Sequence, residues 1–359
     1  YWLCLGSKLF FWREIIMVAC KLSIKKIFDR IELERDDKFE EFKTTYGLTP
    51  SDEMGGTKFA ANFYKSAIVN YKGYVKGSKD LYSEVIAETL VTDGFIKDWL
   101  NLIPVRPEHF KINHLNEHEK LDALKITNRK EEILAKLLFY QGNIDGLGYI
   151  FDYQTPLKAS KNDSYGKVDL LGYNNSDECY SVIELKYRPS GSDETLLRCV
   201  LEVYTYYKLL DINQIKSAVR HDGIQKLKEL SGYKHTNESE LVVLFDEKSC
   251  AKDDGGAETN LMLRIVSNEP NEPNYPSKTV VSQQYKECQE LINPSKRKNL
   301  RALCEAILKQ ESKLKQIRFV VLRTEDIDKA VPLKNVQKWS SELDRSYRAE
   351  TLLTITGKG

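Results

Sequence analysis

Cysteine and histidine, the usual ligands of structural zinc, are scarce in this chain and poorly placed. The 359 residues include seven cysteines, which are scattered, odd in number and never spaced as CxxC. This usage is typical of a reduced protein without a structural zinc site, and we predict a cytoplasmic location. Of the five histidines, His114 and His118 stand four apart, but HExxH order and a third nearby ligand are missing. A zinc site there is not favoured.

Long apolar runs are also missing. The first twenty residues are rich in apolar side chains, but Lys8, Arg13 and Glu14 interrupt them. No uncharged run approaches the length of about 18 residues that a membrane helix needs, so we expect no membrane partner. The first methionine is Met17, and the codons for the WRE tripeptide before it could contain a ribosome-binding sequence. We therefore hypothesise that residues 1–16 are translated upstream sequence and that the natural protein starts at Met17.

An excess of charge of one sign is absent as well. The formal net charge is +1, so the overall charge does not indicate a nucleic-acid binder, and any such binding must come from local patches. Apolar residues make up 41% and charged residues 30%, which is typical of a soluble globular protein. The length allows two ordinary domains, or one large domain with insertions.

The spacing of apolar residues changes near position 106. Residues 22–102 follow helical spacing, and Pro104 and Pro107 then interrupt it. We expect a mostly helical N-terminal region over residues 1–106. A sheet domain with C-terminal additions is expected over residues 107–359.

The second region alternates between strand-like and helical runs. The expected strands cover residues 148–157, 167–173, 180–187, 240–247, 260–267 and 317–325, and the expected helices cover residues 127–143, 193–210, 282–292 and 296–313. Thr127 or Asn128 is a candidate cap for the first of these helices, and Ser192 for the second. The order of helix, three strands, helix and strand, followed by further mixed elements, predicts an α/β or α+β fold.

The segment SVIELKY, residues 181–187, has the pattern of a buried strand but carries two opposite charges. Side chains alternate across a strand, so Glu184 and Lys186 share one face. Asp169 lies in the preceding strand-like run, and a hairpin through residues 174–178 would bring it opposite Glu184. An ion pair on a half-exposed strand would explain the two charges. Two converging carboxylates, however, repel each other unless a cation lies between them, and their hard oxygens favour Mg²⁺ or Mn²⁺.

These groups suit the hydrolysis of a phosphodiester. A divalent cation would polarise a phosphoryl oxygen and lower the pKa of a bound water. Lys186, on the same strand face, would orient or help deprotonate the attacking water, and it would offset charge that develops on the phosphate.

The pattern of Asp169, fourteen intervening residues and then Glu184-Leu185-Lys186 resembles the PD-(D/E)xK nuclease superfamily. In that family a helix supplies an acidic residue, one strand the aspartate and the next strand the E-x-K pair, and a further helix packs behind the site. The resemblance covers about residues 125–250, and Val168 replaces the family's proline. It implies a restriction-endonuclease-like mixed central sheet flanked by helices. It also implies Asp169 and Glu184 as ligands of Mg²⁺ or Mn²⁺, a ligating carbonyl at Leu185 and Lys186 as the catalytic lysine.

The helix before these strands offers two candidates for the family's helix acid. If its apolar stripe at residues 133–138 is buried, Glu131 lies nearer the edge of the stripe and Glu132 nearly opposite. We therefore prefer Glu131 as a further metal ligand. Glu131 also stands three residues after Asn128, which suits a capping box, so both roles stay open.

The helix after the lysine offers candidate contacts to nucleic acid. Some recombination-type members of the family carry Gln-x-x-x-Tyr there, and this chain has Glu202 and Tyr206 at that spacing. Arg198 shares their helix face and could contact phosphate or pair with Glu202. A tyrosine-rich face is also typical of a core, so a packing role stays open.

Two basic stretches are further candidates for binding nucleic acid. Residues 62–82 interleave lysine with tyrosine, which would suit phosphate contacts and base stacking, although a solvated helix face over a core is the favoured interpretation. The second stretch begins a helix with four cations: Lys296, Arg297, Lys298 and Arg301. Cations there oppose the helix dipole, and a bound phosphate would relieve that cost.

We therefore predict a Mg²⁺-dependent endonuclease that acts on DNA, with an N-terminal region that recognises the substrate or a partner. Cutting both strands of a duplex would favour a homodimer. Two alternatives stay open. One is an RNase of the same architecture, and the other is a non-catalytic module that binds nucleic acid or protein on the same scaffold.

Overall fold

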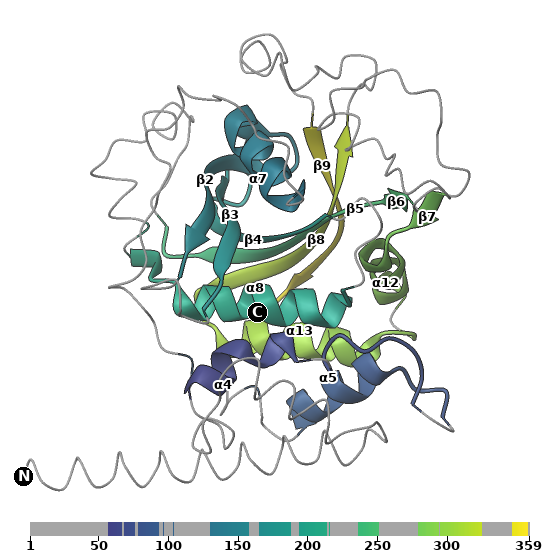
Figure 1. The fold of residues 1–359 in the computed structure, drawn as a ribbon. Helices are drawn as coiled ribbons and strands as arrows, with labels where there is room; N and C mark the ends of the chain where they lie inside the picture. The colour runs from purple at the N-terminus through teal and green to yellow at the C-terminus, as the bar shows by residue number, and fades with distance from the viewer. Residues whose placement is uncertain are drawn as a thin grey trace, which may run out of the picture.

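A mixed seven-stranded sheet lies at the centre of the computed structural model, and helices cover both of its faces (Figure 1). The structure describes residues 57–66, 68–75, 78–92, 96, 103, 130–157, 165–187, 194–213, 215, 236–250, 279–293, 295–324 and 347–357. This architecture confirms the expected α/β or α+β class.

The first half of the sheet comes from a continuous series of elements. In chain order they are α7 (Lys130–Gln141), β1 (Asn143–Ile144), β2 (Gly148–Pro156), β3 (Lys167–Asn174), β4 (Cys179–Lys186), α8 (Leu196–Leu209) and β5 (Ser239–Asp246). The order of a helix, three longer strands, a helix and a strand is the one that the sequence predicts. The short strand β1 was not expected.

The later elements complete the sheet and add two helices. They are β6 (Lys248–Cys250), β7 (Thr279–Val281), α12 (Gln283–Ile292), α13 (Lys298–Gln310), β8 (Leu314–Thr324) and β9 (Tyr347–Thr356). The expected helices at 282–292 and 296–313 and the strand at 317–325 are therefore confirmed within a few residues. The small β6–β7 pair and the strand β9 were not expected from the sequence.

The strands of the main sheet lie in the order β1-β2-β3-β4-β5-β8-β9. Neighbours from β1 to β4 are antiparallel, β4, β5 and β8 run parallel, and β9 is antiparallel to β8. A parallel pair needs a crossover connection, and α8 lies in the connection between β4 and β5. The strand β4 therefore lies inside the sheet, and all eight of its residues are buried.

Alternation along β4 separates two hydrophobic clusters, one on each face of the sheet. Val182 belongs to the larger cluster, which includes side chains of α8 and α13. Ile183 and Leu185 belong to the cluster that includes α7. Because side chains on a strand alternate, Glu184 lies on the α8 face with Val182, as the sequence predicts.

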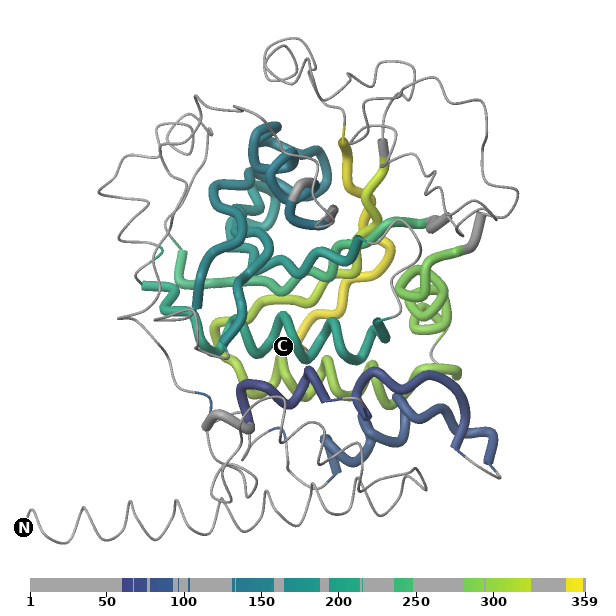
Figure 2. The backbone as a smooth tube through the Cα atoms, in the orientation of Figure 1, coloured from purple at the N-terminus to yellow at the C-terminus, as the bar shows by residue number. Residues whose placement is uncertain are grey.

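The described part of the N-terminal region packs on the α8 face. It comprises α4 (Thr57–Asn62), the 3₁₀ helix η1 (Phe63–Lys65) and α5 (Tyr82–Thr92), and Figure 2 shows this segment running beside α8 and α13. Phe63, Ile86 and Leu90 are buried in the same cluster as the α8 side chains. Between the helices, Gly73 adopts a φ of 105° and Tyr74 forms an antiparallel bridge with Leu81, so the helical spacing is broken there.

Several predictions fall outside the described residues. These are the helices before residue 57, the upstream segment 1–16 with the start at Met17, the His114–His118 pair, the boundary prolines Pro104 and Pro107, the caps Thr127, Asn128 and Ser192, and the strand at 260–267. Within the described ranges, Thr195 caps α8, because its side chain accepts a hydrogen bond from Arg198 N. In that same part of the chain, no helix has the length and apolar character needed to span a bilayer.

Candidate active site

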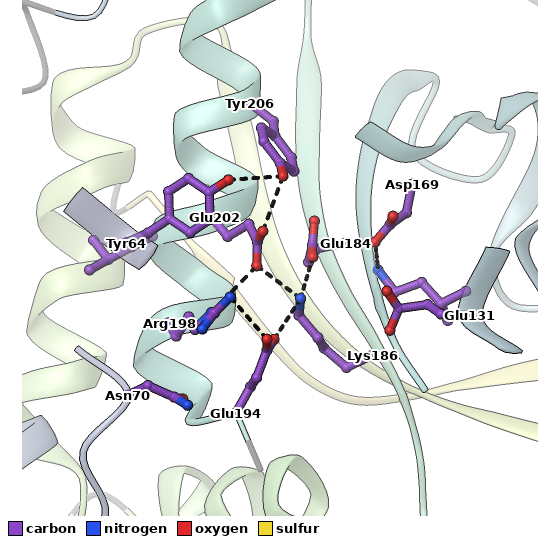
Figure 3. Close-up of polar contacts among 12 residues, drawn as sticks. Tyr64, Asn70, Glu131, Asp169, Glu184, Lys186, Glu194, Arg198, Glu202 and Tyr206 are labelled. Carbon is purple, nitrogen blue, oxygen red and sulfur yellow. Dashed lines mark hydrogen bonds and ion pairs between the residues drawn. The ribbon is translucent and has the colours of Figure 1, made fainter. Parts of the chain in front are cut away.

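The β3–β4 hairpin brings Asp169 beside Glu184. Its turn uses residues 175–178, where Glu178 adopts a φ of 54°. The register pairs Leu170 with Ile183, so one step further along each strand Asp169 lies opposite Glu184. The predicted juxtaposition of the two carboxylates is therefore what the hairpin produces (Figure 3).

Lys186 lies at the centre of an acidic cluster on the α8 face. Its Nζ atom contacts three carboxylates: Glu184 at 2.5 Å, Glu194 at 2.7 Å and Glu202 at 2.8 Å. Lys186 is only 6% exposed and Glu184 only 2%, so this is a buried ion-pair network and not a pair on a half-exposed strand. Burial alone would lower the pKa of Lys186, but the surrounding carboxylates raise it well above its usual value. The side chain is therefore an ammonium.

Asp169 is held by groups from both neighbouring strands. Its Oδ2 accepts a hydrogen bond from Leu185 N at 3.0 Å, and its Oδ1 accepts one from Gln154 Nε2 at 2.9 Å. Gln154 adopts a φ of 49°, which is uncommon for a residue other than glycine. Leu185, the expected carbonyl ligand, is buried between Glu184 and Lys186.

Glu131 reaches the site from α7. It lies in the first turn of that helix, and its Oε2 accepts a hydrogen bond from Tyr187 N at 2.9 Å, just beyond the end of β4. The other candidate, Glu132, points elsewhere and pairs with Lys167 at 3.7 Å. The structure therefore favours Glu131 over Glu132, as expected, while the alternative capping role involves Asn128, which lies outside the described residues.

The acids of the site lie in an environment that disfavours their ionised forms. Burial raises the pKa of Glu131 to about 8, of Asp169 to about 6 and of Glu184 well above its usual value. The charge of Asp169 further raises the pKa of the other two. With Glu194 and Glu202 included, five carboxylates face two cations, Lys186 and Arg198, which leaves three negative charges unbalanced when all are ionised.

One carboxylate oxygen of Glu184 is left without a hydrogen-bond donor. Glu184 Oε2 is buried and accepts no hydrogen bond, whereas Glu184 Oε1 contacts Lys186. A buried oxygen without a donor is costly, and a hard divalent cation is the kind of ligand that would satisfy it. Within the described ranges, however, no three acidic, histidine or cysteine side chains already form a group that could hold a metal ion. The oxygen chemistry and the excess negative charge fit Mg²⁺ or Mn²⁺, with Asp169, Glu184 and Glu131 as the side chains that would hold it.

The face of α8 completes the cluster. Burial alone would raise the pKa of Glu202, but Lys186 and Arg198 lower it to about 2, so its carboxylate is ionised. Tyr206 donates a hydrogen bond to Glu202 Oε1 at 3.0 Å. Arg198 pairs with Glu194 at 3.0 Å and lies 3.9 Å from Glu202, so the predicted pairing is present at longer range.

Glu194 was not identified from the sequence. It lies just before α8 and contacts both Lys186 and Arg198. Its i,i+4 spacing with Arg198, and that of Arg198 with Glu202, was the available signal for a charged helix face.

The basic stretch at the start of α13 has a different environment from the expected one. Arg297 is 4% exposed; its Nη2 pairs with Glu290 at 2.7 Å, and its Nη1 donates to Ser83 at 2.6 Å. Glu84 accepts hydrogen bonds from Asn299 N and Leu300 N. The carboxylate of Glu84 thus takes the place at the helix N-terminus that we had expected for a phosphate. Arg297 is a buried structural residue, whereas Lys296 and Lys298 are exposed and Arg301 is half-buried.

The lysine- and tyrosine-containing stretch at 62–82 divides into buried and exposed parts. Tyr64 and Tyr82 are buried in the core, so neither can stack on a base. Tyr71 is 41% and Tyr74 64% exposed, and Lys72 and Lys79 are exposed beside them. Among the described residues of this stretch, the exposed lysines and tyrosines that could contact nucleic acid therefore lie in the loop between η1 and α5.

Comparison with known proteins adds no relative to this picture. No family model, no curated protein and no solved structure matches the chain.

Proposed function

We propose that this protein is a metal-dependent nuclease that hydrolyses phosphodiester bonds, with DNA as its expected substrate. The observation that carries the proposal is the buried oxygen Glu184 Oε2, which accepts no hydrogen bond and lies among carboxylates next to the Lys186 ammonium. A site with this composition is suited to hold a divalent cation and to bring an anionic phosphate up to a fixed positive charge.

The acids of the site and Lys186 would have different roles in the reaction. Asp169 and Glu184, with Glu131 beside them, would hold the cation, which when bound supplies Lewis-acid activation of the phosphodiester and of the attacking water. Lys186 stays protonated in its network, so it would not act as the general base. Its ammonium would instead orient the water and stabilise negative charge that develops on the phosphate.

The order of elements supports the same proposal. The resemblance to the PD-(D/E)xK superfamily implies a helix with an acid, a strand with the aspartate, a strand with the E-x-K pair and a further helix behind the site. Here α7 carries Glu131, β3 carries Asp169, β4 carries Glu184 and Lys186, and α8 packs on the side of the lysine. We infer a restriction-endonuclease-like fold from this order.

A non-catalytic binding module is the second candidate, because one specific observation favours it. Lys186 already contacts three carboxylates, so the ion-pair network is internally connected without any cation. In such a module the cluster would serve only to hold β4 and α8 together. An RNase would use the same phosphate-directed chemistry, and the choice of substrate in the experiment separates it from a DNase.

The test is incubation with plasmid, single-stranded DNA and RNA, each with Mg²⁺, Mn²⁺ or a chelator. We expect cleavage of DNA that needs the metal and that is lost in Asp169→Asn, a variant that preserves the shape of the side chain. Glu311→Gln is the matched control. Glu311 pairs with Lys208 of α8, and this pair lies outside the acidic cluster.

A thermal shift measured on the same proteins provides a readout that does not depend on activity. Mn²⁺ should raise the melting temperature of the wild type and of Glu311→Gln, but not that of Asp169→Asn, because a ligand that binds only the folded state stabilises it. Metal-independent melting together with no cleavage of any substrate would establish the binding module instead. Cleavage of RNA alone would establish the RNase.

A further inference from the structure

A chain of hydroxyl groups connects the N-terminal segment to the lysine of the proposed site. Tyr64 Oη lies 3.0 Å from Tyr206 Oη, and Tyr206 Oη lies 3.0 Å from Glu202 Oε1. The other oxygen of the same carboxylate, Glu202 Oε2, accepts a hydrogen bond from Lys186 Nζ at 2.8 Å. Tyr64 stands 142 residues before Tyr206 in the sequence, yet Figure 3 shows its hydroxyl directed at that of Tyr206.

The direction of the hydrogen bonds in this chain follows from the charge at its end. An ionised carboxylate can only accept hydrogen bonds, so Tyr206 must give its single proton to Glu202. Tyr206 then has none left for Tyr64, and Tyr64 must be the donor between the two hydroxyls. Glu202 therefore receives one donor through the tyrosines and another from Lys186.

Tyr64 is held firmly enough to act as a fixed donor. It is 1% exposed, and its ring packs edge-on against that of Tyr206 with centroids 5.8 Å apart. The chain that follows it is attached to the start of α8, where Thr195 N donates to Asn70 Oδ1 at 2.7 Å and Thr195 Oγ1 donates to Val69 O at 2.8 Å. Thr195 directly follows Glu194, which contacts Lys186.

We propose that Tyr64 is a positioning residue of the active site, whose hydroxyl fixes Tyr206 and Glu202 and so holds the Lys186 ammonium in place. This inference rests on the proposed nuclease function for its effect on catalysis, but its structural content does not. It makes the N-terminal segment a part of the site and not only a region that recognises substrate.

Removal of the Tyr64 hydroxyl has a defined consequence for the chain. In Tyr64→Phe the ring and its packing remain, while Tyr206 Oη loses its donor, so the hydroxyl that donates to Glu202 is no longer held from its other side. A single buried hydrogen bond of this kind corresponds to a change of about 3- to 10-fold in a rate or equilibrium constant. We expect kcat to fall by about that factor and KM to stay unchanged, because Tyr64 is buried and does not contact the substrate.

The matched control is Tyr204→Phe. Tyr204 is also a fully buried tyrosine, it lies on α8, and its hydroxyl donates to Glu311 at 2.7 Å, outside the cluster. It removes a buried hydroxyl of the same kind without touching Lys186 or Glu202, so kcat should stay at the wild-type value. A fall in kcat of similar size in both variants would show a general loss of packing and would overturn the positioning role.

A double-mutant cycle tests the route through Tyr206. If Tyr64 acts only by orienting Tyr206, then Tyr64→Phe should lower kcat in the wild-type background but have no further effect in Tyr206→Phe. Full additivity of the two effects would contradict the chain.

A spectroscopic readout tests the same inference without any reaction. An ammonium held by three carboxylates exchanges its protons slowly, so Lys186 should give a ¹H–¹⁵N signal that is identified by its loss in Lys186→Met. We expect this signal to shift or broaden in Tyr64→Phe and to stay unchanged in Tyr204→Phe. An unaltered signal in Tyr64→Phe would overturn the inference. If the wild type cleaves no nucleic acid, the proposed function fails, and this spectrum alone then decides the role of Tyr64.

Discussion

At the scale of single residues, the notable feature is Lys186, a lysine of β4 that is buried among carboxylates. Charges are rarely buried unless they are paired, because removing them from water is costly. Lys186 satisfies that condition with three carboxylates, while burial and the neighbouring acids raise the pKa of Glu184 well above its usual value. A network built for stability alone needs no such surplus of acids over cations, and this surplus is what supports the proposed role of the cluster in binding a cation.

The first residue-scale prediction concerns Lys186→Met. The substitution removes the ammonium but keeps a similar length of side chain, so it leaves Glu184, Glu194 and Glu202 facing one another. We expect cleavage to be lost and the free energy of unfolding in chelator to fall by about 3 to 5 kcal/mol, the usual cost of breaking a buried pair. Urea unfolding with and without Mn²⁺ measures this, and Mn²⁺ should recover part of the loss.

Lys208→Met is the matched control for that substitution. Lys208 lies on α8 and pairs with Glu311 at 2.8 Å, but both side chains are partly exposed. We expect it to change the free energy of unfolding by about 1 kcal/mol or less and to leave cleavage unchanged. Equal destabilisation by the two substitutions would show that Lys186 is no more than an ordinary ion-paired residue.

The second residue-scale prediction concerns Asp246, at the end of β5. Burial raises the pKa of Asp246 from 3.8 to about 8. The folded state therefore keeps this proton at pH values where the unfolded chain has lost it, so the stabilising contribution is complete below about pH 4 and is lost as the pH rises to about 8. We expect Asp246→Asn to lose less stability than the wild type between pH 5 and pH 8.5 in urea unfolding. Asp80→Asn removes a carboxylate from an exposed position and is the matched control, and identical pH profiles for Asp246→Asn and the wild type would refute the prediction.

The sequence was most informative where a residue's position follows from strand geometry. Asp169, Glu184 and Lys186 could be placed together because the side-chain period of two and the short hairpin determine which residues face each other. Gln154, which donates a hydrogen bond to Asp169, could not be placed from the sequence. Its backbone adopts a left-handed conformation that no local sequence pattern predicts. Glu194 was missed because its i,i+4 spacing with Arg198 is also typical of an exposed charged helix face.

At the scale of elements, the two ends of the sheet are stabilised differently. The site lies at the C-terminal end of β4, whereas a second buried polar network lies near the N-terminal ends of β4 and β5. There Arg318 donates twice to Glu240, at 2.7 and 2.9 Å, and Ser181 Oγ donates to Glu240 at 2.7 Å. Gln316 also donates to Glu240 at 2.7 Å, so this network is well satisfied and needs no further ligand.

This contrast gives an element-scale prediction. Arg318→Leu removes the cation that neutralises Glu240, which is fully buried, and also its donation to Gly146 O at 2.9 Å. We expect the free energy of unfolding to fall by about 3 to 5 kcal/mol. Arg318→Leu combined with Glu240→Leu should recover much of that loss, because no buried charge then remains unpaired. Urea unfolding of the single and double variants measures the difference, and equal losses would contradict the assigned network.

The elements that the sequence did not predict are those with the weakest local signal. The strand β9 pairs along its length with β8 and forms one further bridge, between Arg348 and Asp145. It mixes buried with exposed residues irregularly, so neither strict alternation nor an apolar run marks it. β6 and β7 each have three residues, which is too short for any periodicity. The long buried strands and amphipathic helices, by contrast, follow their patterns closely.

At the scale of the whole molecule, the division at residue 106 does not correspond to separate cores. Side chains of α4, η1 and α5 belong to the same hydrophobic cluster as those of α8 and α13. Polar contacts reinforce this union, because Glu84 of α5 caps α13 and Ser83 accepts a hydrogen bond from the buried Arg297. With Tyr64 in the site as well, we infer that the described part of the N-terminal region is part of the domain itself.

Removal of the N-terminal region tests this directly. A chain that begins at residue 107 would expose the face of α8 and α13 that Phe63, Ile86 and Leu90 now cover, and it would leave the first amides of α13 without Glu84. Burial of each such side chain contributes about 1.5 to 3 kcal/mol, so these three alone contribute about 4.5 to 9 kcal/mol, which is comparable to the stability of about 5 to 15 kcal/mol that a typical domain has. We expect the shortened chain to lack cooperative thermal unfolding and to aggregate, with circular dichroism as the measurement. A shortened chain that folds cooperatively and retains Mn²⁺-dependent stabilisation would mean instead that the sheet-containing part is independent, and that Tyr64 modulates a site which other residues already hold together.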